Sequence, residues 1–225
     1  MTLIIFAICQ SQLLAQGYLT IGTGFSTMLY DSKDLDRFKE TYNLVNGLNL
    51  GTRMKGFGTG EGLRWQIGYR HFGRLSTAIV AGLQNYKGKD GARFQNGEAR
   101  NLELKIKSFF VEFGLGKDLK KFFVNGILSV YFNRKLTMES MYQGPTDTKN
   151  PLTGTYKSDV PLATDLGIAV GVLREPMVII AKITYPFYTG GKSNIMEDPN
   201  SEKIVDGFNF FPDNFMKFVN GEAYK

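Results

Sequence analysis

Apolar and polar positions alternate strictly along residues 62–74, which read GLRWQIGYRHFGR. Every second residue is large and apolar or aromatic, and the residues between them are polar or lack a side chain. The first set is Leu63, Trp65, Ile67 and Tyr69, and the second is Arg64, Gln66, Gly68 and Arg70. An alternation of period two gives the two faces of a β-strand different chemistries. It leaves open whether the apolar face meets a protein core or lipid.

The same alternation recurs along the chain and predicts seven strands, each close to the ~10 residues that cross a membrane. They lie within residues 17–30, 62–70, 75–86, 102–115, 122–133, 165–173 and 177–185. Their polar faces are rich in Gly, Ala and Ser and carry isolated charges. Glycine weakens a solvated strand, whereas small residues with a few charges fit the narrow interior of an eight-stranded barrel. The polar face is therefore expected inside and the apolar face outside.

The connections between these strands alternate in length. The long ones are residues 31–61, 87–101, 136–160 and 190 onward, and the short ones are 71–74, 116–121 and 174–176. In an up-and-down barrel this order places all short turns at one rim and all long loops at the other, as in outer-membrane barrels. A soluble sandwich or lipocalin-like barrel has no reason to keep that order.

The segment 102–115 changes phase. Its apolar residues are at even positions first and at odd positions later: Leu102, Leu104 and Ile106, then Val111, Phe113 and Leu115. The switch near residues 108–110 predicts either a β-bulge or a strand whose upper half leaves the bilayer. The charges of Glu103, Lys105 and Lys107 fit the second reading.

The first sixteen residues, MTLIIFAICQSQLLAQ, carry no charge and contain an apolar run. They are interpreted as a secretory signal peptide, residues 1–16, with cleavage near Ala15 or Gln16, although the usual basic start is missing. The alternative is a short buried strand. Cys9 is the only cysteine, so no disulfide framework is possible. Residues 17–225 are then a single domain.

The LAQ ending of the leader, the strand GYLTIGTGF and the alternation of turns and loops resemble small outer-membrane β-barrels of Gram-negative bacteria, particularly the Bacteroidota. The expected fold is all-β: an up-and-down antiparallel transmembrane barrel of eight-strand type, located in the cell outer membrane. The resemblance implies contact with outer-membrane lipid and lipopolysaccharide but no single activity. Because such barrels have even strand numbers and GFNFF before Pro212 is too short to cross, a closing strand is expected to be truncated.

A short amphipathic helix is expected in the first long loop, within SKDLDRFKETYNLVNGL. Leu35, Phe38, Tyr42 and Val45 recur at helical spacing, and Ser32 can cap the start. The helix either folds over the barrel mouth and buries its apolar stripe there, which is favoured, or it is a partner-binding element.

The alternation assigns each strand residue to the lumen or to lipid. The expected lumenal polar network is Arg64, Gln66, Arg70, Glu112, Asp165 and Lys182, and the expected lipid-facing residues are Leu63, Trp65, Ile67, Tyr69, Val111, Phe113, Leu166, Ile168 and Val170. Counted from the short turns, Arg70 lies level with Glu112 and Arg64 with Asp165. Isolated buried charges are costly, so these residues are expected to pair and plug the lumen.

Candidate chemistry adds little. The single histidine, His71, lies in an expected short turn, away from the outer leaflet where a lipid-modifying barrel enzyme would need it. No catalytic, cofactor or metal residue is assigned; DPNSEKIVD is spaced like calcium ligands but has Lys203 where an EF-hand needs glycine. The net charge of +6 is spread among acids, so nucleic acid is not expected.

The expected function is structural or surface-binding, through loops outside a filled barrel. The alternatives are a narrow passive transporter for a small or hydrophobic solute, an outer-membrane lipid-modifying enzyme, and a soluble exported barrel that holds a lipophile. The basic residues of 87–107 are candidates to contact lipopolysaccharide phosphates: Lys87, Lys89, Arg93, Arg100, Lys105 and Lys107.

Overall fold

The computed structural model describes residues 2–12, 17–29, 33–119, 121–144, 153–174, 177–190, 195–196 and 208–209. The strands are β1 (Thr2–Gln12), β2 (Gly17–Leu29), β3 (Leu50–Thr52), β4 (Thr59–His71), β5 (Ser76–Phe94), β6 (Ala99–Asp118), β7 (Phe122–Gln143), β8 (Gly154–Arg174), β9 (Met177–Gly190), β10 (Ile195–Met196) and β11 (Phe208–Asn209). The helix is α1 (Lys33–Val45). The all-β expectation and the short helix in the first long connection are both confirmed.

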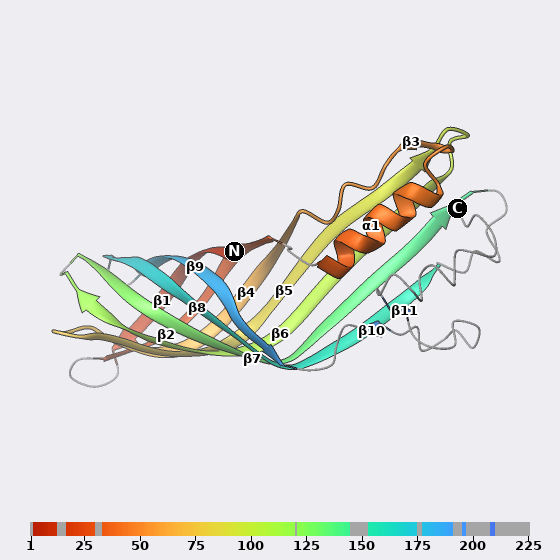
Figure 1. Cartoon of the computed structure of the whole chain (residues 1–225). Coiled ribbons are helices and arrows are strands. Elements are labelled where there is room, and N and C mark those ends of the chain that lie inside the picture. The colour runs from red at the N-terminus through yellow and green to blue at the C-terminus, as the bar shows by residue number, and fades with distance from the viewer. Residues whose placement is uncertain are drawn as a thin grey trace.

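The main sheet is antiparallel and has the order β3-β5-β4-β2-β1-β9-β8-β7-β6, with a further pairing between β5 and β6. The sheet curls into a barrel-like body (Figure 1). Strands adjacent in the chain are adjacent in the sheet wherever a short turn joins them. The order from β4 to β9 is therefore the one that the alternation of connections predicts.

Strand β1 occupies the place between β2 and β9. Thr2–Gln12 pairs with Tyr18–Met28 on one side, and Thr2–Cys9 pairs with Met177–Thr184 on the other. This segment is the predicted signal peptide, and the structure describes it as the alternative, a strand; its role in export stays a prediction. β1 therefore occupies the position beside β2 and β9 where a closing strand is expected. The expectation of a truncated closing strand concerns residues after β9 that lie mostly outside the described ranges.

Four strands are much longer than the others. β5, β6, β7 and β8 have 19 to 22 residues, whereas β2, β4 and β9 have 13 or 14. The expected long loops at 87–101 and 136–160 are largely strand, which corrects the prediction. β5 and β6 meet in a tight turn in which Gly97 has a φ of 89° and donates its N–H to the Phe94 carbonyl at 3.1 Å.

The long strands divide the molecule into two regions. The belt comprises β1, β2, β4, β9 and the halves of β5–β8 nearest the short turns. The extension comprises residues 85–107 and the described residues of 133–160, with α1 and β3. Figure 1 shows the extension as the arm on which α1 lies against β5 and β6.

A β-bulge on β7 lies at the boundary between the regions. The β6–β7 register shifts between Lys107 and Phe109, and Asn133 has a φ of 48°. Below the bulge the odd positions of β7 are buried, and above it the even positions are buried, whereas β6 buries its even positions throughout. The irregularity predicted near 108–110 is confirmed, but the change of phase belongs to β7.

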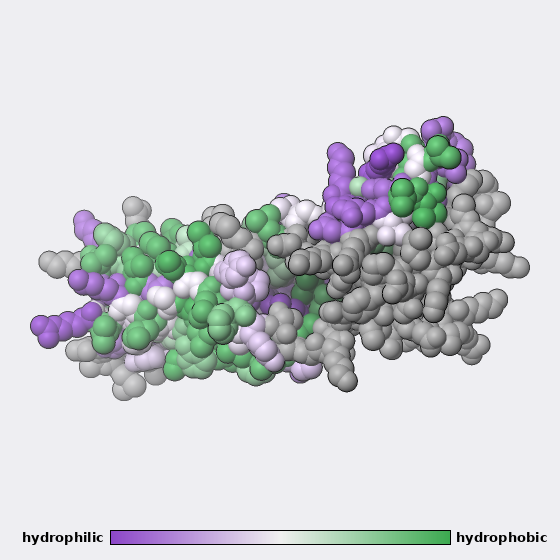
Figure 2. Space-filling model, in the orientation of Figure 1, coloured by the Kyte–Doolittle hydropathy of each residue, from purple (hydrophilic) through white to green (hydrophobic). Residues whose placement is uncertain are grey.

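The apparent phase change of β6 is a change in what its inward face contains. In the extension the inward residues are apolar, and they form a core with the helix: Phe38, Tyr42, Phe94, Leu102, Leu104, Ile106, Met138, Tyr142 and Tyr156. In the belt the inward residues include charges, and large apolar side chains are exposed outside. Figure 2 shows that apolar surface over the belt, and a mixture of polar and apolar surface on the described part of the extension, where Leu44 and Leu48 are exposed. This arrangement fits the second interpretation of residues 102–115, a strand whose upper half leaves the bilayer.

Candidate functional site

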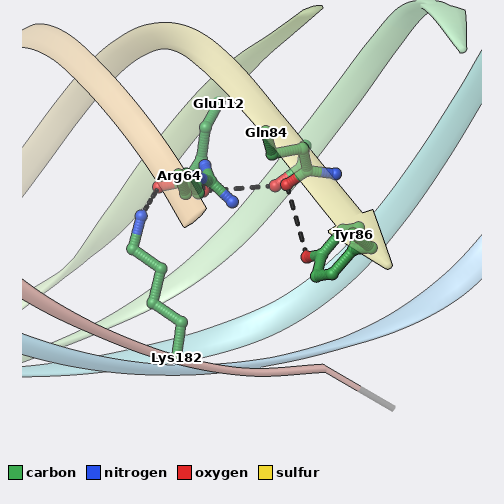
Figure 3. A network of polar contacts seen from close by, with 6 residues as sticks. Arg64, Gln84, Tyr86, Glu112 and Lys182 are labelled. Carbon is green, nitrogen blue, oxygen red and sulfur yellow. Dashed lines mark hydrogen bonds and ion pairs between the residues drawn. The ribbon is translucent and has the colours of Figure 1, made fainter. Parts of the chain in front are cut away.

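A buried ion cluster lies inside the belt, centred on Glu112 of β6 (Figure 3). One carboxylate oxygen is 2.7 Å from an Arg64 Nη on β4, and the other contacts Lys182 Nζ on β9. Ser129 Oγ on β7 donates to Glu112 at 3.3 Å. β9 and β6 are separated by β8 and β7 in the sheet. The contact of Lys182 with Glu112 therefore crosses the interior and links opposite walls of the belt.

Aromatic rings surround these charges. The Arg64 guanidinium lies over the Phe110 ring, 3.5 Å from its centroid. On β5, on the side of Arg64 toward the extension, the Tyr86 hydroxyl donates to Gln84 Oε1 at 3.5 Å, and both side chains are buried. A guanidinium over a ring is stabilised further when water is excluded. The interior is thus filled by large side chains at this level.

All six residues of the expected lumenal network are buried: Arg64, Gln66, Arg70, Glu112, Asp165 and Lys182. Their pairing differs from the prediction. Glu112 binds Arg64 and Lys182, while the Arg70 guanidinium lies over the Phe123 ring, 5.9 Å from its centroid. Asp165 interacts with Arg134 and Tyr131, and more weakly with Arg64, which has its ion pair with Glu112. Counting residues from the turns ignores the stagger between tilted strands and the reach of an arginine, which explains the error.

The residues expected to face lipid lie on the outer surface of the belt. Eight are exposed, namely Leu63, Trp65, Ile67, Tyr69, Phe113, Leu166, Ile168 and Val170. Val111 is half-buried. Contact with lipid stays a prediction, but the face to which each side chain belongs is as expected.

Arg134 is an interior charge that the alternation does not find. Its guanidinium lies 4.6 Å from the centroid of the Tyr131 ring, near Asp165. An unbroken alternation along β7 would turn Arg134 outward, because Phe132 is exposed. The bulge at Asn133 turns it inward. A residue in the left-handed region is the signal, and asparagine tolerates that conformation better than most residues.

The extension has its own well-packed interior. Phe38 and Tyr42 of α1 are buried in its core, so the expected burial of the apolar stripe is confirmed, and it takes place against the extension. Asn43 clamps the following loop, because its amide donates to the Met54 carbonyl and accepts from the Met54 N–H, each at 2.9 Å. Burial raises the pKa of the Tyr42 hydroxyl, so it stays protonated.

The Gly-rich segment GFGTGEG, residues 56–62, is attached to the extension through the side chain of Asp90 on β5. The Asp90 carboxylate accepts the N–H groups of Lys55 and Gly56 at 3.1 and 2.9 Å. Gly56 and Gly58 have φ values of 95° and 54°, which few other residues adopt. The loop is therefore anchored to the extension by backbone contacts.

The outer face of the extension carries paired charges. Glu103 Oε1 lies 2.7 Å from Lys87 Nζ and 3.1 Å from Lys105 Nζ, and Lys105 Nζ lies 2.6 Å from Glu139 Oε1. The hydrogen bond from Lys87, with that from Lys105, holds the pKa of Glu103 below its usual value. Hydrogen bonds to Glu139 and Glu103 raise the pKa of Lys105.

The basic residues of 87–107 lie in different surroundings, with Lys89 and Arg93 exposed toward the end of β5. Lys87 and Lys105 are bound to acids. Arg100 is buried, and its Nη1 donates to the hydroxyls of Ser140 and Thr153 at 3.1 Å each. Lys107 alone of these faces outward at the boundary with the belt, beside a second lysine of β7.

Among the described residues, no helix is long and apolar enough to cross a lipid bilayer. The described residues also contain no group of three or more His, Cys, Asp or Glu side chains that could hold a metal ion. The acidic segment DPNSEKIVD lies outside the described ranges. A scan against protein-family models and a search of the curated proteins both found no match.

Proposed function

We propose that the chain is an integral outer-membrane β-barrel with a filled interior, which presents its extension outside the membrane as a structural or binding platform. The observation that carries this proposal is the reversal of chemistry between the two regions. The belt exposes leucine, isoleucine, phenylalanine and tryptophan and buries arginine, glutamate and lysine. The extension buries apolar residues and exposes ion pairs. The belt also buries apolar residues, Phe123, Val178 and Ile180 among them, so its distinguishing feature is the apolar outer face, which a change of solvent from lipid to water favours.

The height of the belt supports the same proposal. Outward apolar residues of β9 run from Met177 to Phe187. At ~3.3 Å per residue this path is about 33 Å long. A strand tilt of about 40° reduces it to roughly 25 Å, the height of the apolar band of an outer-membrane barrel.

The ion cluster favours a closed interior over a transporter. Lys182 and Glu112 join opposite walls at the level of Arg64, Phe110 and Ser129, and all five side chains are buried. Barrels of this width enclose little more than side chains. We therefore assign the function to the extension, whose helix and clamped loops form an ordered surface.

The N-terminal segment carries a second part of the proposal, that residues 1–16 direct export and are then removed. The mature protein extracted from membranes would start at Gln16 or Gly17, as an intact-mass measurement would show. If the segment is removed, β2 and β9 lose the strand between them, and their edges need another partner because unpaired backbone groups are costly in lipid. A mature mass that includes residues 2–12 would instead assign β1 a permanent place in the sheet.

The test of the closed interior is conductance in planar bilayers. The protein inserted from detergent is expected to be silent. The triple variant Arg64→Ala, Glu112→Ala and Lys182→Ala removes the cluster, leaves Arg70 over Phe123 as the remaining buried cation beside it, and is expected to conduct small ions. A matched triple variant on the outer face of the extension, Lys87→Ala, Glu103→Ala and Lys105→Ala, is expected to stay silent. Steady conductance of the unmodified protein would favour the transporter.

A further inference from the structure

A shallow pocket of about 370 Å³ lies on the outer surface where the belt meets the extension. Its lower part is apolar and includes Leu63, Trp65, Leu83 and Phe109 from three strands. Phe109 lies beside Phe132 of β7, with ring centroids 6.1 Å apart. The bulge at Asn133 forms part of its edge. The pocket therefore opens at the level where an apolar band ends.

The upper part of the pocket holds two lysines, Lys107 of β6 and Lys135 of β7. They stand directly opposite each other in the antiparallel register, and both are exposed. Like charges at directly opposed positions destabilise a sheet. Asn85 lies on the other side of Lys107 in the register, and Asp159 of β8 lies on the far side of Lys135.

Asp159, opposite Lys135 in the register, can offset at most one of the two lysine charges. Along the same outward face Lys105 and Thr137 come next, and Glu103 and Glu139 lie beyond them, where they bind Lys87 and Lys105. In the described part of the chain no ion pair is formed by Lys107 or Lys135. Two adjacent ammonium groups above an apolar floor thus match a molecule with an anionic head and an apolar tail.

We propose that this pocket binds an anionic lipid, with the lipid phosphate between Lys107 and Lys135 and an acyl chain along Leu63, Trp65 and Phe109. The proposal rests on the proposed function, because it requires the belt to lie in a bilayer. Lysine binds phosphate as a point charge, so two lysines need only converge on one oxyanion. The bulge serves the site by placing Lys135 outward above Phe132.

Trp65 is a built-in reporter, since it is the only tryptophan in the chain and it lines the pocket. The full chain is folded into phosphatidylcholine vesicles that contain a minor fraction of lipid with brominated acyl chains, which quench tryptophan on contact. The brominated lipid is either phosphatidylglycerol or phosphatidylcholine. We expect brominated phosphatidylglycerol to quench Trp65 at a lower fraction of total lipid than brominated phosphatidylcholine does.

The variants test whether the lysines are responsible. Each basic residue near an anionic membrane surface strengthens binding by roughly fivefold, so Lys107→Gln or Lys135→Gln should each reduce the preference by about that factor. The double variant should abolish it. The matched control, Lys117→Gln with Lys121→Gln, removes the same charge at the opposite end of the belt and should keep the preference. Millimolar inorganic phosphate should not relieve the quenching, because the acyl chain is part of the ligand.

The outcomes separate the two proposals. Absence of quenching by either brominated lipid would contradict membrane insertion of the belt. Equal quenching by both lipids, with insertion intact, would overturn the lipid site alone. The lipid site is also overturned if the double variant keeps the preference, or if the control loses it equally, because long-range charge would then be sufficient.

Discussion

The two parts of β6 share one alternation but differ in the chemistry of their outer faces. Leu104 in the extension is 1% exposed, whereas Leu115 in the belt is 60% exposed. Glu103 in the extension faces outward in ion pairs, whereas Glu112 in the belt is fully buried in one. Period two determines which residues share a face, but the solvent on each side determines which face is apolar. One strand thus contributes first to a region with an apolar interior and then to a region with an apolar outer face.

The largest expected effect is the loss of the belt's central acid. Glu112→Ala leaves Arg64 and Lys182 without their carboxylate and should destabilise the fold by about 3–5 kcal/mol in a denaturant titration. Adding Lys182→Ala should recover part of that loss, because it removes an unpaired charge. Arg70 is the matched comparison: if Arg70→Ala recovers as much as Lys182→Ala, the contacts assigned to Glu112 are wrong.

The next effect distinguishes the two leucines of β6. Leu104→Ala removes a core side chain of the extension and should cost about 2–5 kcal/mol. Leu115→Ala makes the same chemical change on the outer face of the belt and should cost much less. Hydrogen exchange of residues 99–107 in detergent would locate the damage. Equal protection in the two variants would mean that the extension has no core of its own.

A third prediction compares the same added charge on the outer faces of the belt and of the extension. Ile67→Arg places a charge on the outer face of the belt, where it should cost roughly 2–4 kcal/mol if that face meets lipid. Met141→Arg places the same charge on the exposed outer face of the extension, where the cost should be negligible. Folding yields in vesicles, read from heat-modifiable gel migration, make the comparison. A tolerated Ile67→Arg would mean that the belt does not lie in a bilayer.

The smallest effect is a pH dependence confined to the extension. Glu103 has its pKa lowered on folding by Lys87 and Lys105, so its contribution is present above the unfolded pKa of about 4.3 and is lost as pH falls through the lower folded value. Exposed pairs of this kind contribute about 0.2–1 kcal/mol. Glu103→Gln should therefore lower the melting temperature of the extension at pH 7 and leave it unchanged near pH 2. A constant difference at both pH values would contradict the ion-pair origin.

The alternation of residue types is sufficient to predict the belt apart from β1. It locates the strands between residues 17 and 185 and separates Trp65 and Ile67, which are exposed, from Arg64 and Gln66, which are buried. It missed the extension because its inward face is apolar, so residues 87–101 and 136–160 were interpreted as loops. In a strand whose apolar face changes from outward to inward, the alternation is interpreted as ending where the change occurs, if apolar residues are assumed always to face outward.

The contacts within the site depend on three-dimensional offsets that composition does not contain. Glu112 was predicted to bind Arg70 because both lie near the short turns, but the stagger of the strands and the length of Arg64 bring Arg64 to it. The inward orientation of Arg134 depends on the positive φ of Asn133, which the alternation does not indicate. The segment of β1 fits two readings because a short apolar run favours both a leader and a strand.

The continuity of β5–β8 limits how the length of this chain can evolve. A single-residue insertion within β6 would reverse the faces of every position beyond it in the strand, sending Glu103 inward and Leu104 outward. Insertions of two residues keep the faces and lengthen the extension by a full repeat. The bulge at Asn133 is the position where an odd change is already absorbed. Natural variation in this protein is therefore expected to add or remove residues in pairs within the strands, with odd changes confined to turns and to that bulge.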